Sequence, residues 1–176
     1  MTNKPAAIAA GYRGMTMACA LGYLLTWTTC GTWLPGDRRG WVNRSRTHGE
    51  VVEPPAAPLE VFARQSLVES SFKMDRGMRQ LVDEAIRAAC LRRNVQLWAL
   101  GVRSNHVHAV VTAPAFGPMD LIGLLKTYAT YALRSLVPRK HYWTRYGSTR
   151  YLNNQASLDG AIRYVVNQDS SWNKQP

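Results

Sequence analysis

The sequence predicts a single α+β domain, and three observations favour this class of fold. The chain has 176 residues, of which 46% are hydrophobic, so it is long and apolar enough to bury one substantial core. Some segments place apolar residues at the spacing of an amphipathic helix. Others are short runs of β-branched and aromatic residues, which are typical of strands. We expect the order strand, helix, strand, strand, helix, strand, helix.

The first part of the domain should supply two strands with a helix between them, followed by a third strand. Residues 21–30 are rich in aromatic and β-branched side chains and form the first strand. Residues 75–94 carry apolar side chains at helical spacing with arginines on the opposite face, and Asn94 marks the end of this helix. Residues 95–102 form the next strand, and residues 103–105 make a short turn. The strands on either side of this turn are therefore expected to be antiparallel neighbours.

The second part should contain two helices and an edge of the sheet. Gly117 and Pro118 predict the start of a helix, and Pro138 predicts its end. Residues 139–152 are basic and aromatic, and we expect an edge strand pair there. Ser157 is the expected N-cap of a last helix. The buried stripe of this helix should consist of Leu158, Ala161, Ile162 and Val165.

The charge of the chain points to a polyanionic partner. There are 22 basic and 11 acidic residues, which gives a formal net charge of +11. A folded domain this basic suggests nucleic acid, although a merely solubilising basic surface is the alternative. The three cysteines are widely spaced without a Cys-X-X-Cys pair, so we expect reduced thiols in the cytoplasm. Residues 15–25 are apolar but too short to span a bilayer, so no membrane association is expected.

A long segment rich in arginine, tryptophan and proline divides the first strand from the first helix. Residues 1–14 lack periodicity and are expected to be a disordered lead-in, and residues 15–172 should form the domain. Within it, residues 31–60 are expected to be a long loop, because their prolines and glycines exclude extended regular structure. Arginines with tryptophans suit phosphate contacts and base stacking, whereas a solvated loop pinned by buried tryptophans is the alternative. The candidate DNA contacts are Arg38, Arg39, Trp41 and Arg44 in this loop, and Arg145 and Arg150 in residues 139–152.

Two histidines open the third strand, in Asn105-His106-Val107-His108. Alternate side chains of a strand share a face, so the two imidazoles should point the same way, about 7 Å apart at the backbone. This is close enough for both to bind one metal ion. The residues that should point into the core instead are Val107, Ala109 and Val111. Taken alone, a His-X-His pair is more often two ordinary histidines, so other residues must support a metal site.

Tyr164 and Gln168 lie one turn apart in the last expected helix, so their side chains should be neighbours. By itself, a tyrosine at the edge of a buried stripe normally serves packing. In combination with the element order and the His-X-His strand, however, Tyr164-Val165-Val166-Asn167-Gln168 resembles the HUH-type tyrosine transposases of the IS200/IS605 group and their REP-associated relatives. The similarity extends over most of residues 22–168.

This resemblance implies a fold, a chemistry and a partner. The fold is a ferredoxin-like or RRM-like antiparallel sheet with helices on one face and a C-terminal helix that carries the catalytic tyrosine. His106, His108 and Gln168 match the ligands of a divalent ion, Mg2+ or Mn2+, and Tyr164 matches the nucleophile. The substrate would be single-stranded DNA with hairpin repeats, cleaved through a 5′-phosphotyrosine intermediate. Insertion-sequence relatives are dimers, whereas REP-associated ones can act as monomers; we favour the monomer, with a homodimer as the alternative.

Two other functions are compatible with the sequence. A non-catalytic RRM-like nucleic-acid-binding protein would explain the charge and the aromatic residues, but would leave the histidine pair and the Tyr-X-X-X-Gln helix as coincidence. A replication-initiator or relaxase domain would use the same chemistry. Such domains often carry two tyrosines and a helicase, and this chain is short after Gln168, which disfavours that reading. Metal-dependent cleavage would separate an enzyme from a binding protein.

Overall fold

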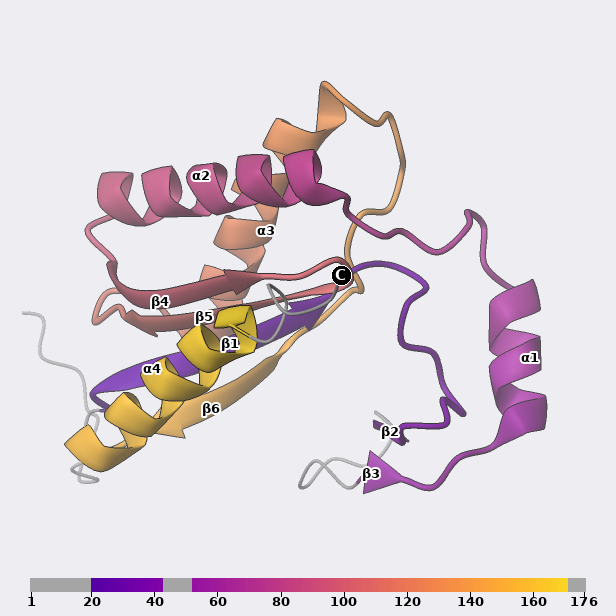
Figure 1. The fold of residues 1–176 in the computed structure, drawn as a ribbon, viewed down its shortest axis with the longest axis horizontal. Helices are drawn as coiled ribbons and strands as arrows, with labels where there is room; N and C mark the ends of the chain where they lie inside the picture. Colours follow the sequence, from indigo (N-terminus) through magenta and orange to yellow (C-terminus); the bar gives the residue numbers. More distant parts are fainter. Residues whose placement is uncertain (1–19, 43–51, 171–176) are drawn as a thin grey trace, which may run out of the picture.

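The structure of the protein is a computed structural model that describes residues 20–42 and 52–170. A four-stranded antiparallel sheet lies at its centre, with the strand order β4-β5-β1-β6 (Figure 1). These strands are β1 (Gly22–Thr28), β4 (Gln96–Val102), β5 (His106–Thr112) and β6 (Ser148–Leu152). The helices that pack on the sheet are α2 (Arg76–Arg92), α3 (Pro118–Arg134) and α4 (Gln155–Ser170).

The connections confirm the predicted fold class. The chain runs β1-α2-β4-β5-α3-β6, and β1 lies between β5 and β6 in the sheet. This connectivity and strand order are those of a ferredoxin-like α+β fold. α2 and α3 lie on one face of the sheet, and α4 is added on the other, where it contacts mainly β4 and β5 (Figure 1). In the described part of the chain, no helix is long and apolar enough to cross a membrane.

Each face of the sheet has its own hydrophobic core, and the alternation of side chains along β5 decides which residue enters which core. Val107, Ala109 and Val111 pack with α2 and α3, as predicted. Val110 points the other way and packs against α4. The two histidines of β5 therefore share the face that α4 covers. The predicted stripe of α4 is confirmed, because Leu158, Ala161 and Val165 are buried there and Ile162 is half-buried.

The residues expected to begin and end α2 and α3 lie at or near the ends of these helices. The Asp75 side chain accepts a hydrogen bond from the Met78 backbone N–H at 2.8 Å and caps α2. Asn94 ends this segment with a positive φ of 53°, in the left-handed region that asparagine tolerates better than most residues. α3 begins at Pro118 and ends before Pro138.

Two expectations for the second half were wrong. Ser157 is not the N-cap of α4, because the helix begins at Gln155 and the Asn154 side chain accepts the hydrogen bond from the Ser157 N–H at 2.9 Å. Residues 139–152 contain one edge strand, β6, and not a strand pair. The segment before β6 is held instead by the Lys126 ammonium group, which donates to the backbone oxygens of Thr144 and Tyr146.

The segment predicted as a long loop is partly regular. It contains a short antiparallel pair, β2 (Trp41–Val42) with β3 (Val52–Glu53), and the helix α1 (Ala57–Gln65). A proline in the first turn favours the start of α1 rather than preventing it, because that turn needs no backbone donor there. No residue of α1 is buried. The predicted lead-in, residues 1–14, and Arg44 lie outside the described residues.

An ion pair between Asp37 and Arg39 fixes the turn before β2. Arg39 Nε and Nη2 donate to the two oxygens of the Asp37 carboxylate at 2.8 and 2.7 Å, and the Arg39 backbone N–H donates to the same group at 2.9 Å. The hydrogen bond from the Arg39 side chain is the main reason why the pKa of Asp37 falls to about 2, and burial of the carboxyl opposes this shift. The charged form of Asp37 therefore stabilises the folded loop.

We expect this ion pair to make folding stability depend on acid pH. Because the folded pKa is about 2 and the unfolded value is 3.8, the stabilisation is present above pH 3.8 and is lost as the pH falls towards 2. Its size at pH 7 is about 2 kcal/mol, from about 1.4 kcal/mol per pKa unit. Urea unfolding of the parent protein and of Asp37→Asn should differ by this amount at pH 7, and the difference should shrink as the pH is lowered from 4 to 2. A difference that stays constant over this range would contradict the assignment.

Candidate active site

His106 and His108 lie side by side on β5, on the face of the sheet that carries α4. Their ring centroids are 4.7 Å apart, with the ring planes at 69°. His108 is buried, and His106 is half-buried. The predicted convergence of the two imidazoles is therefore present in the structure.

Both rings are oriented through their Nδ1 atoms. His106 Nδ1 lies 2.8 Å from the amide oxygen of Asn105, and His108 Nδ1 lies 2.7 Å from the Thr26 hydroxyl oxygen. Thr26 is the residue opposite His108 in the pairing of β1 with β5. An amide oxygen only accepts, so His106 Nδ1 carries the proton and Nε2 is the unprotonated nitrogen of the neutral ring. A hydrogen bond at one ring nitrogen that leaves the other for a metal is the usual arrangement of a metal-binding histidine.

The surroundings keep both imidazoles neutral. Burial, together with smaller contributions from His106 and Arg103, lowers the pKa of His108 to about 4. Burial also lowers the pKa of His106, with a further contribution from Arg103, while a hydrogen bond that the Gln168 side chain accepts from the imidazole opposes the shift. A metal ion binds neutral imidazole, so no proton has to be displaced from either ring at neutral pH.

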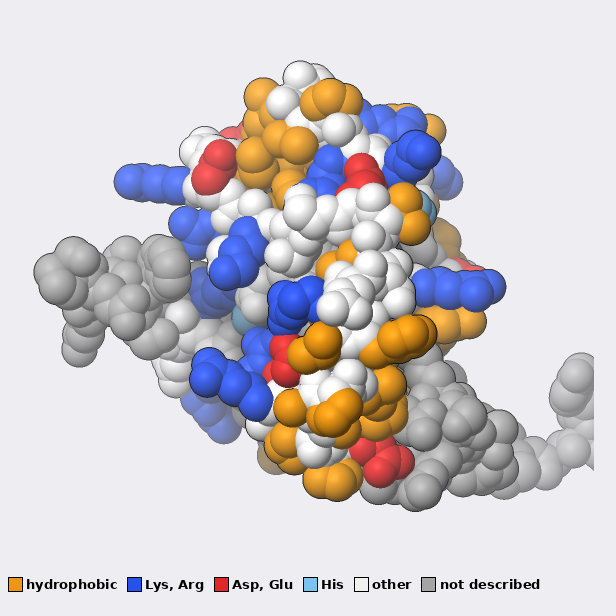
Figure 2. Space-filling model, turned by 90° about the vertical axis from the view of Figure 1, so that its right-hand side faces the viewer, with side chains coloured by type: hydrophobic (Ala, Val, Ile, Leu, Met, Phe, Trp, Pro, Cys, Tyr) orange, Lys and Arg blue, Asp and Glu red, His pale blue; other side chains and the backbone are white. Residues whose placement is uncertain are grey.

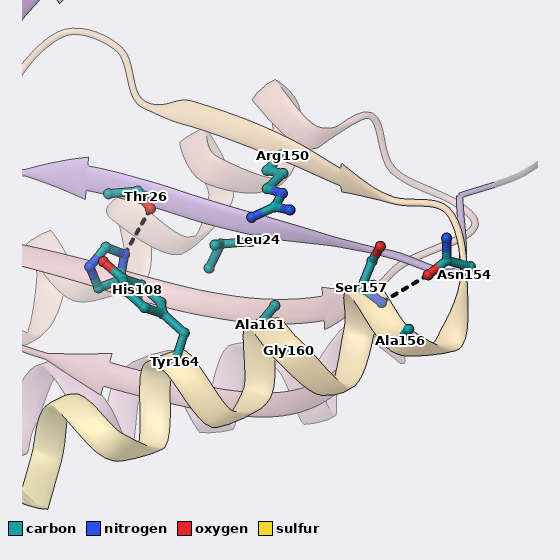
Figure 3. Close-up of a pocket in the computed structure, with 10 residues that line it drawn as sticks. All are labelled: Leu24, Thr26, His108, Arg150, Asn154, Ala156, Ser157, Gly160, Ala161 and Tyr164. Carbon is teal, nitrogen blue, oxygen red and sulfur yellow. Dashed lines mark hydrogen bonds between the residues drawn. The ribbon is translucent and has the colours of Figure 1, made fainter.

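The helix α4 brings the tyrosine and the glutamine of the Tyr-X-X-X-Gln motif to the histidines. The Tyr164 ring centroid lies 5.4 Å from that of His108, at an interplanar angle of 70°. Figure 3 shows the side chain reaching from α4 toward His108. Tyr164 remains 48% exposed, so it is open to solvent and to a substrate. Gln168, one turn further along, hydrogen-bonds to His106.

The residues at this point fit a divalent metal ion. Two neutral imidazoles and one amide oxygen form a nitrogen and oxygen donor set, which suits Mn2+ better than Mg2+, because Mg2+ prefers oxygen ligands. Within residues 20–42 and 52–170, no group of three or more His, Cys, Asp and Glu side chains could hold a metal ion. Two amide side chains contact His106, those of Asn105 and Gln168. The Asn105 oxygen is bonded to His106 Nδ1, so Gln168 is the candidate third ligand.

Removing the amide of Gln168 should weaken Mn2+ binding. We expect Gln168→Ala to raise the dissociation constant for Mn2+ by about tenfold, the lower end of the 10- to 100-fold range for loss of a group that supports a metal site. Electron paramagnetic resonance titration of free Mn2+ measures this directly. Val166→Ala is the control, because Val166 is on the same helix and 54% exposed. Equal affinity in the parent and in Gln168→Ala would show that the third ligand is water or another residue.

A groove leads away from His108 and Tyr164 between α4 and the strands β1 and β6. It has a volume of about 730 Å3 (Figure 3). One wall is formed by Leu24 and Thr26 of β1 with Arg150 of β6, and the other by the first turns of α4. In Figure 3 the Arg150 guanidinium hangs over the groove on the opposite side from α4. An extended chain with negative charges could therefore approach Tyr164 along a path that has a basic wall.

The other predicted DNA contacts are distributed unevenly. Arg150 lines the groove, and the Arg39 charge reaches His106, whose pKa it lowers slightly. Arg38 is exposed on the loop, and Trp41 is half-buried with its indole N–H donating to the Pro54 oxygen at 3.1 Å. Arg145 is exposed, lies over the Tyr146 ring and does not line the groove.

The sequence did not reveal three residues that shape the site. Thr26 could be found only with the register of β1 against β5 known. Arg103 precedes the histidine strand, but its electrostatic effect on both imidazoles depends on the fold. Asn105 was quoted as part of the histidine motif, and a polar residue next to the first histidine was the available signal for its role.

Gly101 determines how closely α4 approaches the histidines. It lies opposite His108 in the pairing of β4 with β5, and a Cβ atom there would be 3.2 Å from Val165 Cγ1. Val165 follows Tyr164, so a larger side chain at position 101 should push α4 and Tyr164 away from the histidines. A displacement of 1 Å can cost about 100-fold in rate, and we expect about this loss of DNA cleavage in Gly101→Val.

Single-turnover cleavage assays with Gly101→Val test this prediction. Gly123→Ala, in α3, is the control for loss of a glycine, because a Cβ there meets nothing within 4 Å. It should cleave like the parent. An active Gly101→Val protein with an unchanged rate would mean that α4 does not depend on this close contact.

Comparisons with known proteins agree with the motifs. The family model for IS200-like transposases matches residues 69–168, which is more than half of the chain. A solved structure of a REP-associated tyrosine transposase bound to a REP hairpin is 14% identical, with a TM-score of 0.49 over 93% of this chain and 74% of that one. A crystal structure described as a transposase from Deinococcus radiodurans R1 is 16% identical, with a TM-score of 0.47 over 90% of this chain and 98% of that one.

A search of curated protein sequences found no match. The family match covers α2, the histidine strand, α3, β6 and α4 as far as Gln168, and so includes all four residues of the candidate active site. The chain belongs to the family of IS200-like transposases.

Proposed function

We propose that this chain is a metal-dependent endonuclease and strand transferase that cleaves single-stranded DNA beside hairpins and becomes linked to the 5′ phosphate through Tyr164. The observation that carries this proposal is the meeting of two motifs that are distant in the sequence. The Tyr164 ring contacts the His108 ring, and Gln168 on the same helix hydrogen-bonds to His106. Tyr164 is half exposed and lines a groove, so its phenol is open to a substrate.

The chain's own residues prepare the reaction. His106 and His108, with Gln168, would hold the divalent ion, and Thr26 and Asn105 fix the two imidazole rings. The bound ion would polarise the scissile phosphate and align it for in-line attack. Tyr164 is one helical turn from Gln168, so a helix that supplies the ligand also brings the phenol to the phosphate.

The covalent step exchanges one phosphate ester bond for another. The Tyr164 phenol loses its proton to the solvent to which it is open, and its oxygen attacks phosphorus. A bond from phosphorus to the tyrosine oxygen forms, and the bond from phosphorus to the DNA 3′ oxygen breaks. The leaving 3′ oxygen takes the electron pair and a proton from water. The phosphotyrosine ester keeps the bond energy, so rejoining to another 3′ hydroxyl needs no nucleotide cofactor.

Single-stranded DNA suits this site better than a duplex. The groove has a basic side chain, Arg150, on one wall and leads directly to Tyr164. An unpaired strand can lie in such a groove with its phosphates near arginine, and its bases are free to stack on exposed aromatic rings. The hairpin next to the cleavage site comes from the resemblance in sequence and forms part of the proposal.

The proposed site is complete within one chain, so we favour a monomer. α4 packs on the β4 and β5 strands that carry the histidines of the same chain. A mixing experiment tests this arrangement: a chain with His106→Ala and His108→Ala is combined with a chain carrying Tyr164→Phe. Two folded but inactive chains should stay inactive together. Recovered cleavage would mean that two chains exchange α4 in a homodimer.

The activity is tested with labelled hairpin DNA carrying a single-stranded flank. With Mn2+, we expect a protein–DNA adduct on a denaturing gel and a free 3′ hydroxyl on the other product. With EDTA, or with the fully paired duplex, neither should form. DNA binding without any adduct at every metal tested would instead identify a non-catalytic nucleic-acid-binding protein and overturn the proposal.

A further inference from the structure

The loop between β1 and α1 is outside the family-matched residues, yet it is bonded directly to the candidate active site. The hydroxyls of Thr29 and Thr32 donate to the backbone oxygen of Asn105 at 3.1 and 3.4 Å. The amide oxygen of Asn105 accepts from His106 Nδ1. The loop therefore shares a hydrogen-bond network with one of the two histidines, although nothing in the family match requires residues 29–40.

Arg39 is the basic residue of this network, and its guanidinium is held on three sides. Beside the two bonds to Asp37, Arg39 Nη2 donates to the Thr32 backbone oxygen at 2.9 Å. Its Cζ atom lies 5.0 Å from the centre of the Trp33 ring, which is a cation–π distance. The Asp37 side chain is 8% exposed, whereas that of Arg39 is 46% exposed. Arg39 is thus a fixed positive charge with an open surface.

Two glycines with positive φ allow the backbone turn that carries the Asp37–Arg39 ion pair. Gly36 and Gly40, on either side of the ion pair, have φ values of 86° and 88°. A Cβ atom at Gly36 would lie 2.3 Å from the Ala56 oxygen, and one at Gly40 would lie 2.4 Å from Val52 Cγ1. The Trp33 indole N–H donates to the Gly40 oxygen at 2.8 Å. Both the conformation and the close packing require glycine, so the geometry that places Arg39 is specified by the sequence.

Arg39 and Arg150 lie toward opposite ends of the candidate site. Arg150 faces Leu24 in the pairing of β1 with β6, and His106 faces Thr28 in the pairing of β1 with β5. These two points are about 13 Å apart along β1, at about 3.3 Å per residue. The loop that carries Arg39 leaves β1 at the Thr28 end. Figure 2 views the molecule from the side of α1, where many Lys and Arg side chains and few acidic ones are visible.

We propose that Arg39, oriented by the buried Asp37 carboxylate, binds a backbone phosphate of the single-stranded substrate next to the scissile phosphate, on the His106 side of the site. Arg39 is the binding residue, and Asp37 is a positioning residue that acts through it. Asp37 and Thr32 engage Nε and Nη2 of Arg39, so Nη1 is the nitrogen that would donate to the phosphate. Less entropy is lost on binding because the side chain is already ordered. This inference rests on the proposed function and identifies a phosphate contact of that site.

Replacing Asp37 separates positioning from net charge, because the two effects change the affinity for DNA in opposite directions. Asp37→Asn removes a negative charge from a DNA-binding protein, so general electrostatics predicts tighter binding to DNA. Loss of positioning predicts weaker binding, because the Arg39 side chain is no longer held. The matched pair for comparison is Asp83 and Arg87 on α2, on the other face of the sheet, where Arg87 Nε donates to Asp83 Oδ1 at 2.6 Å.

The experiment combines these variants with neutral substitutions in the DNA. In the Tyr164→Phe protein, which cannot form the adduct, binding of hairpin oligonucleotides is measured by fluorescence anisotropy while one phosphate at a time is replaced by a methylphosphonate. We expect one phosphate beside the cleavage position to cost about tenfold in affinity. Arg39→Ala should cost about the same and should abolish the response at that phosphate alone.

The other variants should separate positioning from charge. Asp37→Asn should weaken binding severalfold and reduce the same response, and Arg39→Lys should bind weakly whether or not Asp37 is present. Arg87→Ala should keep the response at that phosphate, and Asp83→Asn should leave binding unchanged or slightly tighter. Thermal unfolding of each variant verifies that it is folded.

The results that overturn the inference differ from those that overturn the proposed function. If Arg39→Ala responds to every methylphosphonate as the parent does, or if Asp37→Asn binds more tightly while folded, Arg39 is not the oriented phosphate contact. A covalent adduct through Tyr164 would survive that outcome. Conversely, a failure to form the adduct with Mn2+ would remove the proposed function, even where the methylphosphonate response depends on Arg39.

Discussion

Tyr164→Phe should abolish the covalent protein–DNA adduct while leaving DNA binding within about twofold of the parent. The substitution removes only the phenol oxygen, which is the proposed nucleophile, and retains the ring that packs 5.4 Å from His108. Labelled hairpin DNA and Mn2+ on a denaturing gel report the adduct, and anisotropy reports binding. The expected loss is complete within detection, because the atom that forms the proposed ester is removed.

Tyr131→Phe is the matched control for this experiment. Tyr131 is 66% exposed, so its phenol is at least as accessible as that of Tyr164, but it lies on α3 and its ring is covered by Arg134. α3 is on the other face of the sheet from α4. The Tyr131→Phe protein should form the adduct at the parent rate. A requirement for Tyr131, or an adduct that persists in Tyr164→Phe, would show that the nucleophile has been assigned wrongly.

His108→Ala should remove both metal binding and cleavage. His108 is the more buried of the two imidazoles, its pKa of about 4 keeps it neutral, and its Nδ1 atom is taken by Thr26. Loss of a direct ligand should cost at least as much as the 10- to 100-fold that supporting groups cost, and we expect a 1,000-fold loss or more in the rate of adduct formation, on the order of 4 kcal/mol of activation free energy.

Calorimetric titration with Mn2+ and a single-turnover cleavage assay measure the two effects of His108→Ala. His141→Ala serves as the control, because His141 is an exposed histidine that pairs with Glu69 away from the site. It should behave as the parent does. Parent-like cleavage in a folded His108→Ala protein would exclude the histidine pair as the metal site. Lost cleavage with unchanged Mn2+ affinity would assign His108 a role in the reaction other than ligand.

Local patterns were sufficient to predict most of the fold. The period-two alternation in residues 106–111 placed two histidines on one face and three apolar residues on the other, and the structure has this arrangement. Helical spacing identified α2, α3 and α4 because each has a buried stripe. α1 was missed because the prolines and glycines of residues 31–60 favoured a loop, and the helix buries no residue.

The supporting residues of the site could not be predicted, because they depend on contacts between distant segments. Thr26 meets His108 through the register of two strands that are far apart in sequence. The role of Gly101 depends on where α4 crosses β4. Arg39 was a candidate phosphate contact by composition alone, and only the folded loop shows that a buried carboxylate holds it.

The most direct test of the account is to identify the atom that becomes linked to DNA. The protein is incubated with hairpin DNA and Mn2+, the adduct is digested with protease and nuclease, and the modified peptide is sequenced by mass spectrometry. We predict a single modified peptide from α4, with a nucleotide attached through its 5′ phosphate to Tyr164. A nucleotide on any other residue, or cleaved DNA with no modified peptide, would contradict the assignment of this chain as a tyrosine strand transferase.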